Sequence, residues 1–389
     1  MKSTQRPSPP ANGGCLRVLV VMGTRPEAIK MAPVVRALQA RPAAFDVRVC
    51  ATAQHREMLD QVLEVFAIVP DVDLNLMQPG QTLSGLGARV LSSLDPVLEA
   101  ERPDWVLVQG DTTTVMMAAL AAQHRQVRVG HVEAGLRTGD RRNPFPEEMN
   151  RVVADHVSDL CFAPTEATRR NLLREGIPEA RIRVTGNTVV DALRAVSGTD
   201  WAPDPGSALA DLPEDREWLL VTAHRRENHG QPLEEICGAL QRIAEERGQR
   251  VQIVYPVHRN PKVWEPVHER LGGLPGVTLL PPVDYRALIY LMGRCRLVLT
   301  DSGGLQEEEP SLDKPVLVLR ETTERPEAVK AGATRIVGTH AQRIIDETYR
   351  LLDDPAAYAQ MAEAPNPYGD GHAAERIAEA LTEASANGP

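Results

Sequence analysis

Three carboxylates early in the chain follow predicted strands or open a predicted helix. Asp111 comes soon after the apolar run 105–109, Glu133 comes directly after the run 127–132, and Glu147 follows a proline-rich turn. The carboxyl ends of parallel strands meet at one edge of a sheet, where open α/β sheets bind ligands. These carboxylates are therefore expected to converge, as general acids and bases must.

Two of these carboxylates also have a plainer interpretation. Asp111 taken alone is more readily explained as the N-cap of the next helix. Glu147 taken alone could be simple helix-start charge. Three acids at one sheet edge are harder to explain as caps than one is.

Two turns and an arginine suit an anion. Gly23-Thr24-Arg25 follows a strand and opens a helix, so an arginine lies beside the helix N-terminal amides. Ser302-Gly303-Gly304 follows the run 297–300 in the same way, although this tripeptide is equally common in ordinary loops. Arg325 lies beside a later predicted helix start.

His224 and an acidic run complete the set. His224 ends the first strand of a second strand series, where it could act as an acid, a base or an anion-binding group. The His-Arg-Arg-Glu sequence that it opens is equally compatible with an ion-pair network. The run Glu307–Glu309 carries carboxylates that could bind ribose hydroxyls.

Several classes of site are disfavoured. Gly23 is the only glycine of the first turn, so the G-x-G-x-x-G of dinucleotide-binding proteins is absent, and no P-loop sequence occurs. A redox cofactor such as NAD is therefore not expected. No His-x-x-x-His pair or Cys-x-x-Cys pair is present, so a metal is not expected either. A net charge of −10 argues against nucleic acid and anionic membranes as partners.

Short β-branched runs alternate twice with amphipathic stretches, which is typical of parallel α/β sheets. The predicted strands are 16–22, 46–52, 105–109, 127–132 and 160–163, then 218–222, 252–255, 277–280, 297–300 and 315–319. The predicted helices of the first half are 26–40, 54–66, 83–101, 112–123 and 147–157. We expect two Rossmann-like doubly wound domains facing a central cleft, residues 15–184 and 185–368. Residues 369–389 carry a further helix, for which a return to the first domain is one option.

The remaining segments point to a cytoplasmic protein. Residues 1–14 are polar and rich in proline, which predicts a disordered tail rather than a signal peptide. No stretch approaches eighteen consecutive apolar residues, the length that a membrane helix needs. Five scattered cysteines fit a reducing compartment.

Ten segments in series resemble the non-hydrolysing UDP-N-acetylglucosamine 2-epimerases, and they occur in family order between Leu16 and Gly338. They are GTRPEAIKMAPV (23–34), AQHREMLDQVL (53–63), GDTTT (110–114), GHVEAGLRTGD (130–140), PFPEEMNR (144–151), GNTVVDAL (186–193), TAHRREN (222–228), YPVHRNP (255–261), TDSGGLQEE (300–308) and TTERPEA (322–328).

The resemblance implies a fold like the two-domain GT-B glycosyltransferases, a homodimer, and UDP held mainly by the second domain. The proposed catalytic groups of the family fall on Asp111, Glu133, Glu147 and His224. For UDP binding the resemblance implies Arg25 and Lys30 at the phosphates, Ser302, Gly303 and Gly304 around the diphosphate, Glu308 at the ribose and Arg325 on the phosphate side.

Two further implications concern the edges of the site. The family often has a phenylalanine near the uracil where this chain has Leu288, so backbone contacts and Tyr285 or Tyr290 are expected there instead. Some members are activated by UDP-GlcNAc at a second site, for which the matching residues are Gln54, Arg56 and His258.

The expected function is the reversible conversion of UDP-GlcNAc to UDP-ManNAc through 2-acetamidoglucal, without a cofactor. The alternatives are an epimerase of a modified UDP sugar, a hydrolysing epimerase, a glycosyltransferase and a nucleotide-sugar-binding regulator without activity.

Overall fold

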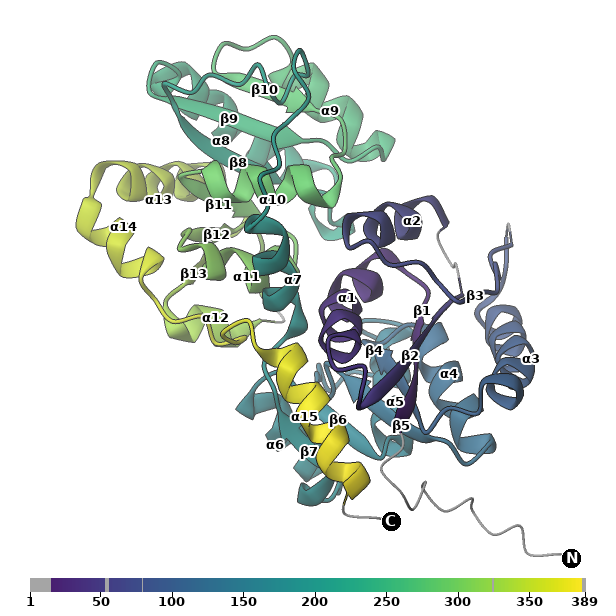
Figure 1. Cartoon of the computed structure of the whole chain (residues 1–389). Coiled ribbons are helices and arrows are strands. Elements are labelled where there is room, and N and C mark those ends of the chain that lie inside the picture. The colour runs from purple at the N-terminus through teal and green to yellow at the C-terminus, as the bar shows by residue number, and fades with distance from the viewer. Residues whose placement is uncertain (1–14, 53–55, 79, 324, 387–389) are drawn as a thin grey trace, which may run out of the picture. The chain divides into compact units, whose positions relative to one another are not determined.

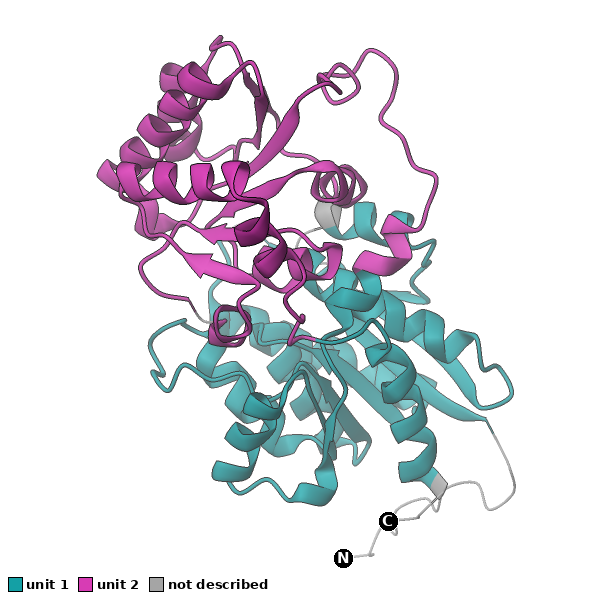
Figure 2. Ribbon diagram, turned by 90° about the vertical axis from the view of Figure 1, so that its left-hand side faces the viewer, with its two compact units in different colours: residues 1–192, 369–389 teal, residues 193–368 magenta. Residues whose placement is uncertain are grey.

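The computed structural model describes residues 15–52, 56–78, 80–323 and 325–386 and divides the chain into two compact units. Unit 1 comprises residues 1–192 and 369–389, and unit 2 comprises residues 193–368 (Figure 2). The predicted tail, residues 1–14, lies outside the described residues.

Unit 1 is built on a parallel sheet with the strand order β3-β2-β1-β4-β5-β6-β7 among its described residues (Figure 1). Its strands are β1 Leu16–Met22, β2 Phe45–Ala51, β3 Val72–Asp73, β4 Trp105–Gln109, β5 Arg128–Val132, β6 Leu160–Ala163 and β7 Ile182–Val184. Its helices are α1 Arg25–Gln39, α2 Arg56–Val65, α3 Leu83–Glu101, α4 Thr113–His124, α5 Glu147–Val157, α6 Glu166–Arg174, the 3₁₀ turn η1 Glu179–Arg181 and α15 Ala373–Ala386, with α7 Thr188–Ser197 crossing the unit boundary.

Strand β1 shows how this sheet is buried. Its residues Leu19 and Val21 pack with the apolar residues of α3 and α4, because alternate side chains of a strand point to one face. Helix α1 packs against both α2 and α15. Pro26 occupies the first turn of α1, as predicted, where its missing amide hydrogen costs nothing.

The C-terminal helix α15 belongs to unit 1 although it follows unit 2 in the sequence. The Asp191 carboxylate accepts hydrogen bonds from the amides of Ala373 (3.3 Å) and Ala374 (2.8 Å) and so satisfies the start of α15. Near the C-terminal end of α15, Trp105 Nε1 donates to Ser385 Oγ at 3.3 Å. Unit 1 extends to Ala192, past the predicted boundary at residue 184, and the added residues include Asp191, which holds the start of α15.

Unit 2 repeats the same plan with the strand order β10-β9-β8-β11-β12-β13 among the described residues. Its strands are β8 Glu217–Thr222, β9 Val251–Pro256, β10 Val277–Leu280, β11 Leu297–Thr300, β12 Val316–Val318 and β13 Thr334–Ile336. Its helices are α8 Gln231–Arg247, α9 Pro261–Leu271, α10 Tyr285–Arg294, α11 Leu305–Glu308, α12 Pro326–Ala331, α13 Ala341–Asp353 and α14 Pro355–Ala362, with 3₁₀ turns η2 Arg226–Asn228 and η3 Glu309–Leu312.

The predicted fold class is confirmed, since both units are doubly wound parallel sheets. The strand order reverses between β1 and β4 in unit 1 and between β8 and β11 in unit 2. In open α/β sheets such a switch point leaves a crevice at the carboxyl ends of the two strands, and ligands bind there. No helix within the described part of the chain is long and apolar enough to cross a membrane.

Candidate functional site

The predicted residues of unit 1 gather at its switch point. Strand β1 ends at Met22 and leads into Gly23 and Arg25, while β4 ends at Gln109 and leads into Asp111. Strand β5 is the next neighbour of β4, and the Gly110 amide donates to Val132 O at 3.1 Å. Asp111 and Glu133 therefore lie at adjacent strand ends, as the sequence predicts.

Glu133 is held by three polar side chains. Its Oε2 accepts from Gln109 Nε2 at 3.0 Å and from Asn187 Nδ2 at 3.3 Å, and it pairs with the Lys30 ammonium. The residue is 9% exposed. Its φ of 66° is unusual for a residue with a side chain, and strain of this kind is concentrated at functional sites. The resemblance implies a phosphate role for Lys30, and the structure places its ammonium on this carboxylate.

Asp111 is oriented from helix α5. Its carboxylate pairs with Arg151 Nη2 at 3.1 Å, and its carbonyl accepts from Asn150 Nδ2 at 2.8 Å. The cap of α4 is Thr112, whose hydroxyl accepts from the Val115 amide at 3.3 Å. The alternative interpretation of Asp111 as that cap is therefore wrong, and its carboxylate, 31% exposed, faces Arg151 instead.

The two glutamates that begin α5 have different surroundings. Glu148 is buried, and its carboxylate accepts from the amides of Thr138 (3.1 Å) and Gly139 (2.9 Å), so it organises the preceding loop. Glu147 is the first residue of the helix and half-buried. Its carbonyl accepts from Arg151 Nε at 3.4 Å, so Arg151 connects the backbone of Glu147 with Asp111.

Glu27 is a buried acid at the same switch point that was not predicted from the sequence. Its Oε2 accepts from the Gly23 amide at 2.6 Å and so closes the turn that carries Arg25. Burial raises the pKa of Glu27 to about 7, although the Gly23 amide and the Thr112 hydroxyl favour the charged form.

Glu27 makes stability depend on pH. Its pKa in the folded protein, about 7, lies above the ordinary value of 4.5, so its stabilising contribution is complete below about pH 4.5 and is lost as the pH rises through 7. Glu27→Gln keeps an acceptor for Gly23 and does not titrate. As the pH rises from 4.5 to 8, the free energy of unfolding of the wild type is expected to fall by about 3 kcal/mol relative to that of this variant, at ~1.4 kcal/mol per pKa unit. Urea unfolding at several pH values measures the difference, with the exposed Glu64→Gln as control. A difference that stays constant with pH would contradict the raised pKa.

The switch point of unit 2 is organised by Asp301. This aspartate follows β11, is fully buried, and its Oδ2 accepts from the amides of His224 (2.9 Å) and Arg225 (2.8 Å) and from Asn228 Nδ2 (2.9 Å). The hydroxyls of Thr222 and Thr300, which end β8 and β11, lie 2.6 Å apart. The turn after β8 is thus fixed to the turn after β11.

His224 projects from this turn. Its Nδ1 lies 3.5 Å from Asp301 Oδ1, and its side chain is 41% exposed. Partial burial lowers the pKa of His224, although the Asp301 carboxylate opposes this effect. The ring is therefore neutral at neutral pH, which leaves one nitrogen as a donor and the other as an acceptor.

Two guanidinium groups flank the glycine turn of unit 2. A Cβ added to Gly303 would lie 3.3 Å from Arg225 Nη2 and 4.0 Å from the central guanidinium carbon of Arg325. Arg325 Nε also donates to the buried carboxylate of Glu307. The helix that follows the turn, α11, spans only Leu305–Glu308 before a 3₁₀ turn, so these cations, rather than a helix dipole, supply most of the positive charge.

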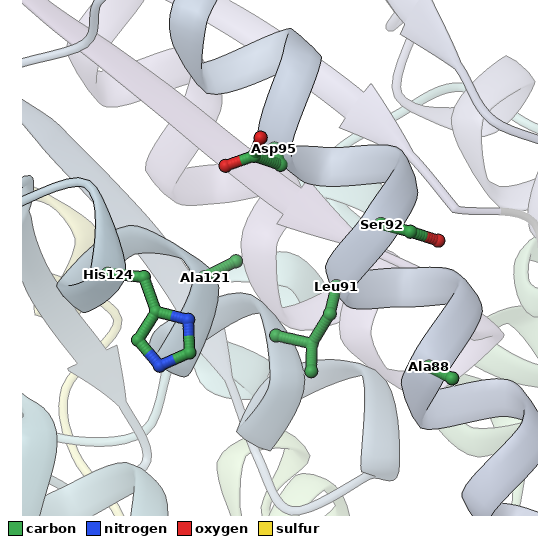
Figure 3. A pocket seen from close by; sticks show the side chains of 6 residues that line it. All are labelled: Ala88, Leu91, Ser92, Asp95, Ala121 and His124. Atoms are coloured by element: carbon green, nitrogen blue, oxygen red, sulfur yellow. The ribbon is translucent and has the colours of Figure 1, made fainter.

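A hollow in unit 1 lies apart from these turns, between α3 and α4 (Figure 3). It is lined by Ala88, Leu91, Ser92, Asp95, Ala121 and His124. Asp95 pairs with Arg125 at 2.5 Å. The residues predicted for the site are not among those that line this hollow. Within the described ranges, no group of three or more His, Cys, Asp or Glu side chains could hold a metal ion.

Comparison with known proteins assigns the chain to a family. The family model for UDP-N-acetylglucosamine 2-epimerase matches residues 36–382. The UDP-N-acetylglucosamine 2-epimerase of Escherichia coli strain K12 is 55% identical over 371 residues, which cover 94% of this chain and 98% of that protein. The chain belongs to the UDP-N-acetylglucosamine 2-epimerase family.

Solved structures of other epimerases agree with this assignment. The UDP-GlcNAc 2-epimerase of Neisseria meningitidis, bound to UDP-GlcNAc, superposes with a TM-score of 0.87 at 46% identity and covers 95% of this chain and 100% of that one. The UDP-GlcNAc 2-epimerase of Methanocaldococcus jannaschii, in complex with UDP-GlcNAc and UDP, has a TM-score of 0.77 at 34% identity, with the same coverage. The predicted resemblance to this epimerase family and its GT-B-like fold is confirmed.

In this member of the epimerase family, the two tyrosines expected near the uracil have different surroundings. Tyr285 is buried, and its hydroxyl lies 3.5 Å from Glu308 Oε1. The ring of Tyr290 packs edge-on against Trp201, with centroids 5.6 Å apart, and lies near Trp218. Tyr285 is therefore the one that accompanies the predicted ribose-binding residue Glu308.

The residues predicted for a second, activating site of the epimerase are only partly described. Gln54 lies outside the described residues, and Arg56 is described only as the first residue of α2. His258 is exposed, and its ring stacks on that of His224 with centroids 5.4 Å apart and planes at 12°. His258 thus lies directly beside a residue predicted to be catalytic.

The sequence analysis missed the residues that position the predicted carboxylates of the epimerase. Arg151 could have been predicted from the sequence, because it follows Glu147 by four residues on one helix and so lies on the same face. Asn187, 54 residues from Glu133, lies in the segment GNTVVDAL that carries the resemblance, whereas Gln109, 24 residues from Glu133, had no such signal.

Proposed function

We propose that this chain interconverts UDP-GlcNAc and UDP-ManNAc by eliminating UDP and adding it back to the other epimer, without a redox cofactor. The observation that carries the proposal is the pair of oriented carboxylates at neighbouring strand ends, Asp111 and Glu133, each held by a cation or amide of the same unit.

The chemistry explains why elimination is needed. The C2 hydrogen beside an acetamido group is only weakly acidic, so its direct removal has a high barrier. When the C1–O bond breaks and its electron pair leaves with UDP, C1 becomes electron-poor and the C2 proton becomes acidic. The C2–H electron pair then forms the C1=C2 double bond of 2-acetamidoglucal, and the proton passes to a base. Return of a proton to the opposite face of C2, with UDP adding to C1, gives the epimer.

Unit 1 is proposed to supply the proton-transfer groups. Two faces of C2 require two acid/base groups, drawn from Asp111, Glu133 and Glu147. Arg151 holds the Asp111 carboxylate in one orientation, and Gln109 helps to do the same for Glu133. Such orientation by neighbouring side chains contributes to the rate because the reacting groups need no rearrangement.

The leaving diphosphate is proposed to bind mainly to unit 2. The turn Ser302-Gly303-Gly304 offers backbone to the diphosphate, with Arg225 and Arg325 beside Gly303. Charge-assisted hydrogen bonds from guanidinium groups are the strong ones for phosphate oxygens. Neutral His224 can donate a hydrogen bond to the oxygen that leaves C1.

The outer parts of the nucleotide are assigned by proximity and by resemblance. Glu308, with Tyr285 beside it, is proposed to bind the ribose. Arg25 and Lys30 are proposed to add positive charge for the phosphates from unit 1. The homodimeric state and the cytoplasmic setting stay predictions from the resemblance and from the scattered, unpaired cysteines of the described chain.

An isotope experiment tests the proposal. With UDP-GlcNAc in D₂O and no added NAD, the UDP-ManNAc formed is expected to carry one deuteron at C2, because the proton removed exchanges with solvent before another returns. Proton NMR measures both the manno product and the loss of the C2 signal. Full retention of the original C2 hydrogen would falsify elimination, and free sugar released with equimolar UDP would show a hydrolysing enzyme instead.

A further inference from the structure

A row of charged side chains runs from the exposed Glu175 to the buried His131 and ends at the turn that carries Asp111. His131 Nδ1 lies 2.6 Å from Asp155 Oδ1, and His131 Nε2 lies 2.7 Å from the Gly110 carbonyl oxygen. Asp155 Oδ2 accepts from Arg137 Nη2 at 2.7 Å, and Arg137 in turn pairs with Glu175 at 2.6 Å. The side chains of His131 and Asp155 are fully buried.

These contacts determine the protonation of His131. A carbonyl oxygen can only accept, so Nε2 must carry a hydrogen to approach Gly110 O at 2.7 Å. The positive charge of Arg137, 2.7 Å from Oδ2, favours the ionised form of Asp155, and the Gly135 amide donates to the same oxygen at 3.2 Å. Nδ1 must then carry a hydrogen as well, since otherwise its lone pair would face a carboxylate oxygen at 2.6 Å.

The electrostatics agree with this geometry. Burial disfavours the imidazolium, but the Asp155 carboxylate and the Gly110 carbonyl together outweigh that effect and raise the pKa of His131. Burial likewise disfavours ionised Asp155, but His131 and Arg137 lower its pKa. The four groups Glu175, Arg137, Asp155 and His131 carry two negative and two positive charges, so the row is neutral as a whole.

The same row leads to the proposed catalytic turn. Gly110 has a φ of 84°, its amide donates to Val132 O at 3.1 Å, and its carbonyl accepts from His131. The next carbonyl, that of Asp111, accepts from Asn150 at 2.8 Å. The peptide that carries Asp111 is therefore fixed on both sides, and its carbonyl on the Gly110 side depends on His131 alone among the hydrogen bonds of the described residues.

We propose that His131 is a positioning residue that acts as a buried, doubly protonated imidazolium: its Nε2–H holds the Gly110 carbonyl and thereby orients the Asp111 carboxylate for proton transfer at C2. Its catalytic part rests on the proposed function. Replacing a buried ion pair with apolar residues often leaves stability unchanged or raises it. Stability therefore does not explain the charged row, whereas orientation of the Gly110–Asp111 turn does.

Two variants separate positioning from general support of the fold. The amide nitrogen of glutamine reaches the place of His Nε2, so His131→Gln keeps a donor for Gly110 and loses the one for Asp155. The amide nitrogen of asparagine reaches the place of Nδ1, so His131→Asn keeps a donor for Asp155 and loses the one for Gly110. His131→Gln leaves a carboxylate oxygen of Asp155 without this donor, and His131→Asn leaves the neutral Gly110 carbonyl without one, so the loss of stability is expected to be at least as large in His131→Gln.

Their kinetics are expected to differ. His131→Asn should lower kcat roughly 10²-fold, the loss that follows about 1 Å of misplacement, whereas His131→Gln should lose roughly tenfold less. KM should change little in either, because the row belongs to unit 1 and the diphosphate is proposed to bind mainly to unit 2. Equal losses of kcat in the two variants, or a larger loss in His131→Gln, would overturn the positioning role.

The protonation state has its own test, which needs no activity. Wild-type protein labelled with ¹⁵N-histidine should show, at pH 7.5, one ring with both nitrogens protonated, and this signal should be missing from the spectra of both variants. A neutral tautomer at His131 would overturn the imidazolium. If the chain fails to exchange C2 hydrogen in D₂O while this signal is present, the proposed function is wrong and the buried imidazolium stands.

Discussion

Asp111→Asn and Glu133→Gln are each expected to lower kcat by roughly 10²–10⁴-fold, the size of loss that removal of a general acid or base produces. Both changes keep the shape of the side chain and remove its ability to take up a proton. Because the diphosphate is proposed to bind mainly to unit 2, the affinity for UDP should change far less than kcat. Coupled assay of UDP-ManNAc and calorimetry with UDP measure the two quantities.

The two variants also differ in a useful way. Glu133→Gln leaves Lys30 with an amide partner in a buried setting, so this variant is expected to lose stability as well as activity. Asp111 is 31% exposed, and Arg151 keeps Glu148 at 3.6 Å as a second carboxylate partner, so Asp111→Asn is expected to lose less stability than Glu133→Gln. Asp95 is a surface carboxylate of the same unit that pairs with Arg125, so Asp95→Asn is the matched control, and its kcat should stay near that of the wild type. A kcat near wild type for Asp111→Asn would remove Asp111 from the proton-transfer groups.

Gly135→Ala is expected to destabilise the protein by roughly 2–5 kcal/mol, made up of ~1–2 for a left-handed residue with a side chain and ~1–3 for overpacking. Gly135 has a φ of 86°, and a Cβ added there would lie 2.5 Å from the backbone oxygen of Thr168 and 2.9 Å from Leu172 Cγ. Helix α6, which carries both, would have to move, and with it the loop after Glu133.

Gly139→Ala is the control for this experiment. Gly139 has nearly the same backbone conformation, with φ of 81°, but a Cβ there would meet no other atom of the described residues within 4 Å. This variant should cost only the backbone part, roughly 1–2 kcal/mol. Urea unfolding of both variants measures the difference. Equal losses would mean that the approach of α6 to Gly135 does not limit the fold.

Strand prediction succeeded where the strand is buried on both faces. Leu16–Met22, Trp105–Gln109, Leu160–Ala163 and Leu297–Thr300 begin and end as predicted, because a central parallel strand needs a nearly continuous apolar run. The edge strands β3, β7 and β13 were missed, since two or three residues carry no readable periodicity, whereas the four-residue edge strand β10 begins and ends as predicted.

The sequence alone determined the two doubly wound sheets, the strand ends that carry Asp111, Glu133 and His224, and the resemblance to the epimerase family. Local apolar runs and turn residues encode these features, so they can be read without knowing any contact across the chain. Only the tertiary structure decided that Thr112 caps α4, which releases Asp111 to Arg151, because both residues are good caps and the choice depends on where α5 packs. It also decided that His131 lies against Asp155 and Gly110, a charged row formed by residues far apart in sequence and held in place by burial.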